Sequence, residues 1–165
     1  MMMSSSETIL KKVGLFADLS DKPESLGLLH RIMKIRKFPK GKVITEQGTS
    51  GEDFFVLIDG ELSVHKKTID GEDYNVAVMK SHQYPSFGEG GLIDGEVRSA
   101  TIICETEVQC LVLNKSEFNN LCFEHPEIGL PIYKKIAQGL IKRLNQTSND
   151  LLLLHRALMD EIRSQ

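Results

Sequence analysis

The sequence has few of the features that mark secreted, membrane-spanning or disulfide-bonded proteins. Its three cysteines are an odd number without C-x-x-C spacing, which indicates reduced, mostly buried thiols at Cys104, Cys110 and Cys122. No apolar run is long enough to span a membrane, and residues 1–6 lack the basic-then-apolar form of a signal peptide. These absences predict a cytoplasmic protein with no membrane segment.

Residue sets for metal binding and catalysis are also missing. The five histidines fall in different predicted elements, and no pair of them has the spacing of metal ligands. There is no G-x-S-x-G motif to supply a nucleophilic serine. A net charge of −3 gives no electrostatic reason for nucleic-acid binding. We expect no catalysis, no metal, no resident cofactor and no nucleic-acid partner for this chain.

What is present is an ordinary globular composition, with 41% hydrophobic and 26% charged residues in a chain of 165. This length is enough for one domain with a proper core and one extra element. The pattern predicts a flexible N-terminus over residues 1–8, a domain over residues 9–125 and a C-terminal helical segment over residues 126–165. A first helix over Glu7–Val13 and a second helix capped by Ser20 are predicted before the first strand.

From Met33 onward, short apolar runs alternate with turn residues. Asp59-Gly60 and Asp70-Gly71 each join two such runs and predict hairpins. Strands at this regular spacing favour an antiparallel sandwich or barrel over βαβ units. The predicted strands are Met33–Phe38, Lys42–Thr45, Asp53–Ile58, Glu61–Lys67, Tyr74–Met79, Thr101–Cys104 and Val108–Leu113.

Two helices are predicted after the strands. Asn114 has the spacing of a capping box and should begin a short helix that stops near His125-Pro126. Because Gly129-Leu130-Pro131 interrupts a helix begun at Pro126, the long helix is predicted to start at Pro131 and to end near Arg163.

The long helix carries an a/d seam whose members step by four and three residues, namely Leu140, Leu144, Thr147, Leu151, Leu154 and Leu158. The apolar residues of this helix that lie close to the domain are expected to pack on the chain's own core. These are Ile132, Ile136 and Leu140. The later members are expected to face a second copy, because a domain of this size has little core left to cover Leu151, Leu154 and Leu158. The sequence thus predicts a homodimer through this helix.

The segment Phe87–Thr101 combines glycines, one acid and one arginine in a way that suits a small anion carrying a sugar. Its glycines let the backbone turn tightly and approach a ligand. Backbone N–H groups at the N-terminus of a short helix favour negative charge. Arg98 can pair with the anion through its planar fork, and Glu89 can accept a hydrogen bond from a sugar hydroxyl.

The same segment resembles the phosphate-binding cassette of cyclic nucleotide-binding domains, whose pattern is F-G-E, two small or apolar residues, Leu, five variable positions and R-[ST/A]-A-[ST]. The spacing is correct, whereas Gly90 replaces a larger apolar residue and Val97 replaces a common proline. The resemblance covers about residues 9–125 and implies an eight-stranded antiparallel β-roll, a jelly roll, with N-terminal helices and a long C-terminal helix. It implies ligand contacts from Phe87, Gly88, Glu89, Gly90, Gly91, Leu92, Arg98, Ser99 and Ala100.

A second resemblance lies on the long helix. The string Arg143-Leu144-Asn145-Gln146-Thr147-Ser148 resembles R-L-x-x-T-S in the dimerisation helix of catabolite-activator-type members of that family. There the Thr contacts the base in its own subunit, and the Ser reaches the nucleotide in the other subunit. The resemblance therefore adds Arg143, Thr147 and Ser148 to the ligand-binding residues. The DNA-reading helix-turn-helix of that type is not expected here, because the chain ends at Gln165.

Together these features predict a regulatory cyclic nucleotide sensor for signal transduction. It is expected to bind cAMP in preference to cGMP, and the bound phosphate is expected to shift the long helix over the base. An effector domain or a partner protein would receive the signal. The alternative is a degenerate β-roll that serves as a dimerisation or interaction module without nucleotide. Intact Glu89 and Arg98 argue against the alternative, since a buried arginine without an anion is costly to fold around.

Overall fold

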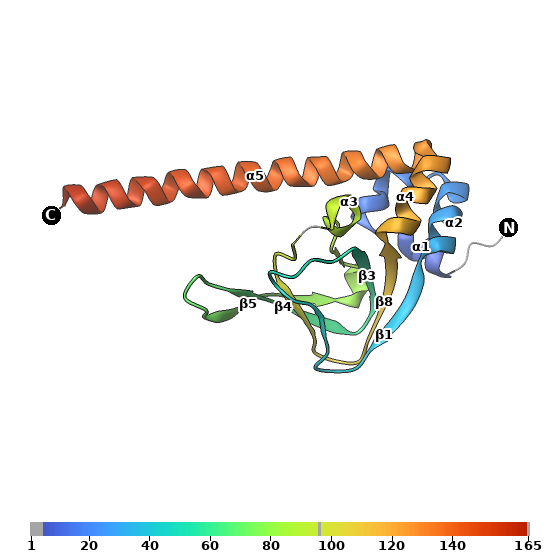
Figure 1. Cartoon of the computed structure of the whole chain (residues 1–165), viewed down its shortest axis with the longest axis horizontal. Coiled ribbons are helices and arrows are strands. Elements are labelled where there is room, and N and C mark those ends of the chain that lie inside the picture. Colours follow the sequence, from blue (N-terminus) through green and yellow to red (C-terminus); the bar gives the residue numbers. More distant parts are fainter. Residues whose placement is uncertain (1–4, 96, 165) are drawn as a thin grey trace. The chain divides into compact units, whose positions relative to one another are not determined.

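The computed structural model, which describes residues 5–95 and 97–164, contains two antiparallel sheets of four strands each. The strand order is β1-β8-β3-β6 in one sheet and β2-β7-β4-β5 in the other, and helices gather at one end of the roll that the sheets form (Figure 1). The predicted eight-stranded jelly roll is confirmed. Its strands are β1 (Lys34–Phe38), β2 (Val43–Thr45), β3 (Asp53–Asp59), β4 (Glu61–Lys67), β5 (Asp73–Lys80), β6 (Ser86–Phe87), β7 (Thr101–Cys104) and β8 (Val108–Asn114).

The two Asp-Gly turns have different roles. Asp70-Gly71 joins β4 to β5, which pair antiparallel, and Gly71 has a φ of +85°, so this predicted hairpin is confirmed. The hairpin predicted at Asp59-Gly60 is wrong, because β3 and β4 belong to different sheets. Gly60, with a φ of +90°, instead turns the chain from one sheet to the other.

Two neighbouring phenylalanines of β3 belong to two layers of packing. Phe55 lies in the core of the roll, where its ring stacks on Phe87 at 4.9 Å and meets Phe38 edge-on at 6.4 Å. Successive side chains of a strand point to opposite faces, and the adjacent Phe54 meets Phe16 of the N-terminal helices edge-on at 5.9 Å. Fully burying a side chain of this kind stabilises a fold by about 1.5–3 kcal/mol. Strand β3 therefore fixes the helices to the roll.

The N-terminal segment is more ordered than predicted. Helix α1 spans Ser5–Leu10, so residues 5–8 are helical rather than unstructured, and residues 1–4 lie outside the described residues. Leu10 is fully buried, and α1 packs against the second helix. Packing of this kind stabilises a helix that is too short to be stable by itself.

The second helix, α2 (Pro23–Ile32), does not begin where the sequence predicted. Ser20 follows a 3-10 helix, η1 (Gly14–Leu19), and its N–H donates to the carbonyl of Ala17. The Ser20 cap is therefore wrong. Pro23 opens α2 instead, because its fixed φ and missing N–H suit the first position of a helix.

Helices α4 (Lys115–Glu124) and α5 (Pro126–Arg163) follow the last strand. The predicted Asn114 cap is confirmed, since its side-chain oxygen accepts a 3.0 Å hydrogen bond from the N–H of Ser116. The predicted end of the long helix near Arg163 is also confirmed. Its predicted start at Pro131 is wrong, because α5 already begins at Pro126 and continues through Pro131.

Glycine at position 129 explains why α5 begins so early. A Cβ atom at Gly129 would lie 2.6 Å from Sγ and 2.8 Å from Cβ of Cys122, so the bare backbone lets α5 pack directly on α4. Ile128 and Ile132 are fully buried. This packing holds the first turns of α5 together although Pro131 removes one backbone donor.

The chain forms two compact units, of which Met1–Ile132 contains both sheets and Tyr133–Gln165 is the rest of the C-terminal segment. Ile132 and Ile136 are buried as expected, whereas Leu140 is 45% exposed, which contradicts its predicted packing. A step of four residues rotates around a helix by about 40°. An apolar stripe spaced by fours therefore turns away from the buried side by Leu140.

Cys104, Cys110 and Cys122, all described by the structure, form no disulfide, and Cys104 and Cys110 are buried, as predicted. Burial raises the pKa of the Cys110 thiol to about 12, with a further rise from Cys104 and an opposing effect of Arg36. The thiol is therefore protonated at neutral pH. Among the residues that the structure describes, no helix is both long and apolar enough to cross a bilayer.

Candidate functional site

The segment Phe87–Thr101, called the cassette below, begins with a short strand and a tight turn. Gly88 has a φ of +82°, and the four-residue helix α3 (Gly91–Asp94) follows it and ends at Gly95, whose φ is +59°. The N–H of Gly91 donates to the carbonyl of Gly88 at 3.0 Å, and the N–H of Leu92 donates to that of Glu89 at 3.2 Å. The sequence predicts that backbone N–H groups at the start of this helix bind an anion. These two N–H groups instead donate to carbonyl oxygens within the turn.

Two of the predicted ligand-binding residues attach the cassette to the core. Phe87 pairs with Phe55 in the β3–β6 register and stacks on its ring. Leu92 is fully buried. Their side chains fix the start of the cassette and the short helix in place, so their contribution to the site is packing.

The guanidinium of Arg98 is half-buried and has protein partners. Nη2 donates to the carbonyl of Asp53 at 2.7 Å, and Nη1 lies 3.5 Å from the carbonyl of Gly88. The guanidinium carbon lies 6.0 Å from the centre of the Phe55 ring. Arg98 is thus oriented by two carbonyl oxygens and an aromatic face.

Asp53, which supplies the shorter of these bonds, is itself fixed on both sides. One carboxylate oxygen accepts a 2.9 Å hydrogen bond from the side chain of Asn114, and the other lies 3.3 Å from Nη1 of Arg36. Asn114 also caps α4. The position of the Asp53 carbonyl is therefore set by groups on β1 and at the end of β8.

The loop between β2 and β3 forms a second wall of the site, and sequence reasoning missed it. The N–H of Gly48 donates to the carbonyl of Arg98 at 2.9 Å, and the N–H of Arg98 donates to the carbonyl of Thr49 at 2.7 Å. Ser50 forms a β-bridge with Val97. Gly48 and Gly51 are residues typical of a turn, but their spacing does not indicate that this turn pairs with the cassette.

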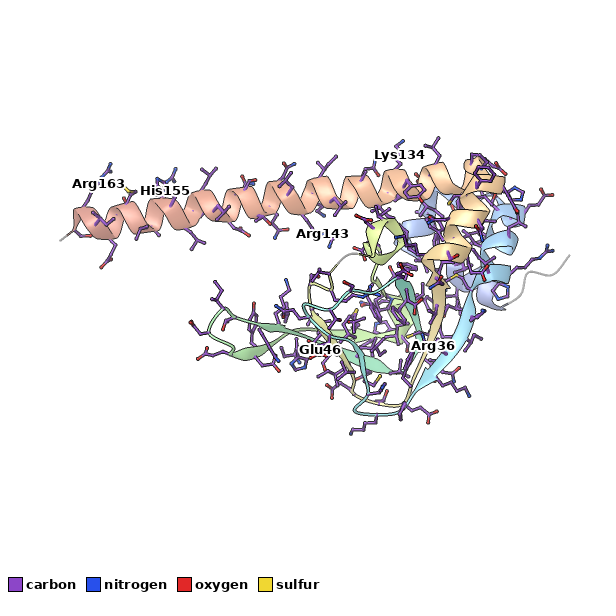
Figure 2. All side chains as sticks on the ribbon, viewed as in Figure 1. Arg36, Glu46, Lys134, Arg143, His155 and Arg163 are labelled. Atoms are coloured by element: carbon purple, nitrogen blue, oxygen red, sulfur yellow. The ribbon has the colours of Figure 1, made fainter. Side chains whose placement is uncertain are left out.

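A pocket of about 490 Å³ lies beside Arg98. Arg36 of β1 and Glu46 of the segment after β2, both labelled in Figure 2, line it. The wall also includes Lys42 and Glu52, so it mixes both signs of charge. The predicted ligand-binding residues all lie within the described part of the chain. Of these, Arg98 alone lines this pocket.

The remaining predicted residues of the cassette lie before and after Arg98 in the sequence. Glu89, Gly90 and Ala100 are half-buried, and Ser99 is exposed. The carbonyl of Ala100 accepts a 3.3 Å hydrogen bond from the Thr45 hydroxyl, which fixes the end of the cassette to β2. Of the predicted cassette residues, Gly88 and Gly91 lie against the Arg98 guanidinium, and the ligand contacts of the others remain a prediction.

The other three predicted residues lie on the second compact unit. Arg143 projects from α5 (Figure 2), and Thr147 and Ser148 follow it one turn later on the same helix. All three are exposed. Their contribution to a nucleotide site remains a prediction.

Comparison with known proteins identifies the family. The family model of the cyclic nucleotide-binding domain matches residues 35–125, which include all of α4 and every strand except the first residue of β1, Lys34. The chain belongs to the cyclic nucleotide-binding domain family. The cassette, with Arg98 and Glu89, lies inside the matched part of this cyclic nucleotide-binding domain.

Several relatives of this domain are much longer proteins. The cAMP-dependent protein kinase regulatory subunit of Dictyostelium discoideum is 31% identical over 118 residues, which are 70% of this chain and 35% of that protein. Human cGMP-dependent protein kinase 2 is 30% identical over 138 residues, which are 83% of this chain and 17% of the kinase. The chain therefore spans only a part of these relatives.

Among solved structures, the catabolite activator protein of Thermus thermophilus is 26% identical, with a TM-score of 0.72 over 85% of this chain and 62% of that one. The N-terminal domain of a transcriptional regulator from Streptomyces coelicolor A3(2) has the same identity and TM-score and covers 84% and 94%. Relatives named for cAMP and relatives named for cGMP both match this chain.

Proposed function

We propose that this cyclic nucleotide-binding domain is a non-catalytic sensor that binds cAMP in preference to cGMP. The observation that carries the proposal is the guanidinium of Arg98, held in the glycine-rich cassette by the carbonyls of Asp53 and Gly88. Hydrogen bonds between an ionised donor and an anion are about twice as strong as neutral ones. A cyclic phosphate can therefore compete for a guanidinium that is already oriented.

Within the cassette, the proposed roles follow from side-chain chemistry. Arg98 pairs with the phosphate, and Glu89 accepts a hydrogen bond from the ribose 2′-hydroxyl. Phe87 and Leu92 hold the cassette on the core. The backbone around Gly88, Gly90, Gly91, Ser99 and Ala100 forms the rest of the ligand frame.

Base recognition is assigned to α5. The hydroxyls of Thr147 and Ser148 can accept from the adenine amino group or donate to a ring nitrogen, and Arg143 precedes them on the same helix. Ligand binding then favours a helix position in which these groups meet the base. Such a shift requires only that the nucleotide bind one helix position more tightly than the other.

The exposed leucines of α5 support the proposed homodimer. Leu144, Leu151, Leu154 and Leu158 are each 58–66% exposed, although they follow one a/d seam. A second copy of the same helix would cover them. The signal would pass to an effector domain or a partner protein, and the free thiols of Cys104 and Cys110 suit a cytoplasmic location.

One observation favours a second candidate, an interaction module that binds no nucleotide. Arg98 has two carbonyl partners in the structure, so its partial burial does not require an anion. Burying Arg98 without a bound anion therefore costs less free energy than the sequence alone suggests. The two candidates differ in a single measurement.

That measurement is isothermal titration of the purified chain with cAMP, cGMP and non-cyclic AMP. The sensor predicts saturable binding of both cyclic nucleotides, tighter for cAMP, and much weaker binding of AMP. Heat of dilution alone for all three ligands would establish the interaction module instead.

A further inference from the structure

Gly51, Gly88 and Gly91 lie around the guanidinium of Arg98, and they differ in what a side chain would meet. A Cβ at Gly88 would lie 2.5 Å from Nη1 of Arg98 but also 2.7 Å from the carbonyl of Asp53, and its φ is +82°. A Cβ at Gly91 would lie 2.7 Å from the carbonyl of Gly51. Substitutions at these two positions disturb rigid backbone as well as Arg98.

Gly51 is different because it faces the arginine side chain. The three nearest atoms to a Cβ built there all belong to the Arg98 guanidinium: Nη2, then Nε at 2.5 Å and Cζ at 2.8 Å. The φ of Gly51 lies outside the left-handed region, so other residues can adopt its backbone conformation. A side chain at position 51 is thus opposed by the far end of a flexible side chain.

The same loop also holds the backbone of Arg98. The carbonyl and the N–H of Arg98 bond to Gly48 and Thr49. The loop therefore fixes the main chain of Arg98 with two hydrogen bonds, and it leaves room for the guanidinium by having no side chain at position 51.

We propose that Gly51 is a positioning residue for the anion site, and this proposal rests on the proposed function of Arg98. Its missing side chain keeps the guanidinium against the carbonyls of Asp53 and Gly88, in the orientation from which it meets the phosphate. Any side chain at 51 displaces the guanidinium while the fold is kept. The loop before β3 is thus as much a part of the ligand site as the cassette.

The test is Gly51→Ala, measured by titration with cAMP beside wild type and Arg98→Ala. Because the planar fork must meet the anion in a fixed geometry, we expect binding to weaken about tenfold or more. The far-ultraviolet circular dichroism and the melting temperature should stay close to those of wild type. Gly14→Ala is the matched control, since a Cβ at Gly14 has no atom within 4 Å, and it should bind as wild type does.

A second readout requires no ligand. In ¹H–¹⁵N spectra, the Nε–Hε resonance of Arg98, assigned by its loss in Arg98→Ala, should move in Gly51→Ala and stay in place in Gly14→Ala. Wild-type affinity in Gly51→Ala, an unmoved resonance or loss of the fold would each overturn the proposal. If wild type binds no nucleotide, the proposed function fails instead, and the resonance alone decides whether Gly51 positions Arg98.

Discussion

Arg98 and Asp53 are joined by a 2.7 Å hydrogen bond from a guanidinium nitrogen to a main-chain carbonyl. Asp53 opens β3, the strand that carries Phe54 and Phe55 into the two packing layers of the domain. The orientation of Arg98, the proposed phosphate-binding residue, therefore depends on a strand that is packed in both layers. This relationship explains how a half-buried guanidinium is oriented before any anion binds.

Replacing Arg98 by alanine should weaken cyclic nucleotide binding by roughly 2–5 kcal/mol, because it removes one partner of a partly desolvated charge pair. Arg98→Lys should restore only part of the loss, since an ammonium cannot form the two-pronged contact. Titration calorimetry with cAMP measures both, and Arg31→Ala, at an exposed position of α2, is the control. Unchanged affinity in Arg98→Ala would remove the cassette from the binding site.

Glu89→Gln should reduce the discrimination between cAMP and its 2′-deoxy analogue. Wild type should prefer cAMP because a carboxylate accepts a stronger hydrogen bond from the ribose hydroxyl than an amide does. The measured quantity is the ratio of the two dissociation constants. Equal ratios in wild type and variant would assign Glu89 a structural role.

The double variant Thr147→Val with Ser148→Ala should bring the affinities for cAMP and cGMP closer together. Each lost hydrogen bond to the base should cost about 0.5–1.5 kcal/mol, while helix and approximate volume are kept. Competition titrations give the ratio of the two affinities. A ratio equal to that of wild type would show that the base is read elsewhere.

Leu151→Asp should convert the proposed dimer into a monomer, because it places a charge in the a/d seam. Leu153→Asp is the matched control, since Leu153 is equally exposed, at 62% against 61% for Leu151, but lies outside the seam. Multi-angle light scattering with and without cAMP measures the mass. A monomeric wild type at high concentration under both conditions would contradict the proposed partner.

Cys110 should make the domain less stable in alkaline solution. Its folded pKa is raised to about 12 by burial, so the stability that it contributes is complete below the unfolded pKa and declines as pH rises. Between pH 8 and pH 10 this decline should be about 1–2 kcal/mol. Urea unfolding under a reducing agent measures it, and Cys110→Ala should show a flatter dependence. Parallel curves for the two proteins would exclude this thiol as the cause.

The sequence predicted most of the roll because its strands are long enough to show a pattern. The strand missed was β6, which has only two residues and lies between Pro85 and Gly88, where the residue types indicate a turn. The Asp59-Gly60 turn does not form the predicted hairpin. An Asp-Gly pair indicates a positive φ, but it does not indicate whether the next strand pairs with the previous one or joins another sheet. Local chemistry determines the turn, and tertiary packing determines the partner.

The cassette could be predicted because its chemistry is continuous in sequence, from Phe87 to Thr101. The loop at Gly48–Gly51 could not, because its bonds to Arg98 join residues about fifty positions apart. The early start of α5 depended in the same way on a contact between Gly129 and Cys122 that residue types alone do not reveal. Sequence thus gives the charged groups of the site, and long-range contacts give their orientation.

Strand β5 lies at the edge of its sheet, and Tyr74, Val76 and Val78 on it are 48–51% exposed. An edge strand with apolar side chains and unpaired backbone groups is a template for adding a strand from another molecule. The proposed homodimer through the leucines of α5 and strand addition at the edge of β5 would be two structurally distinct routes of self-association. Val76→Lys places a charge on the edge of β5 and leaves α5 unchanged. This variant should therefore prevent aggregation through β5 while keeping the proposed signalling dimer through α5.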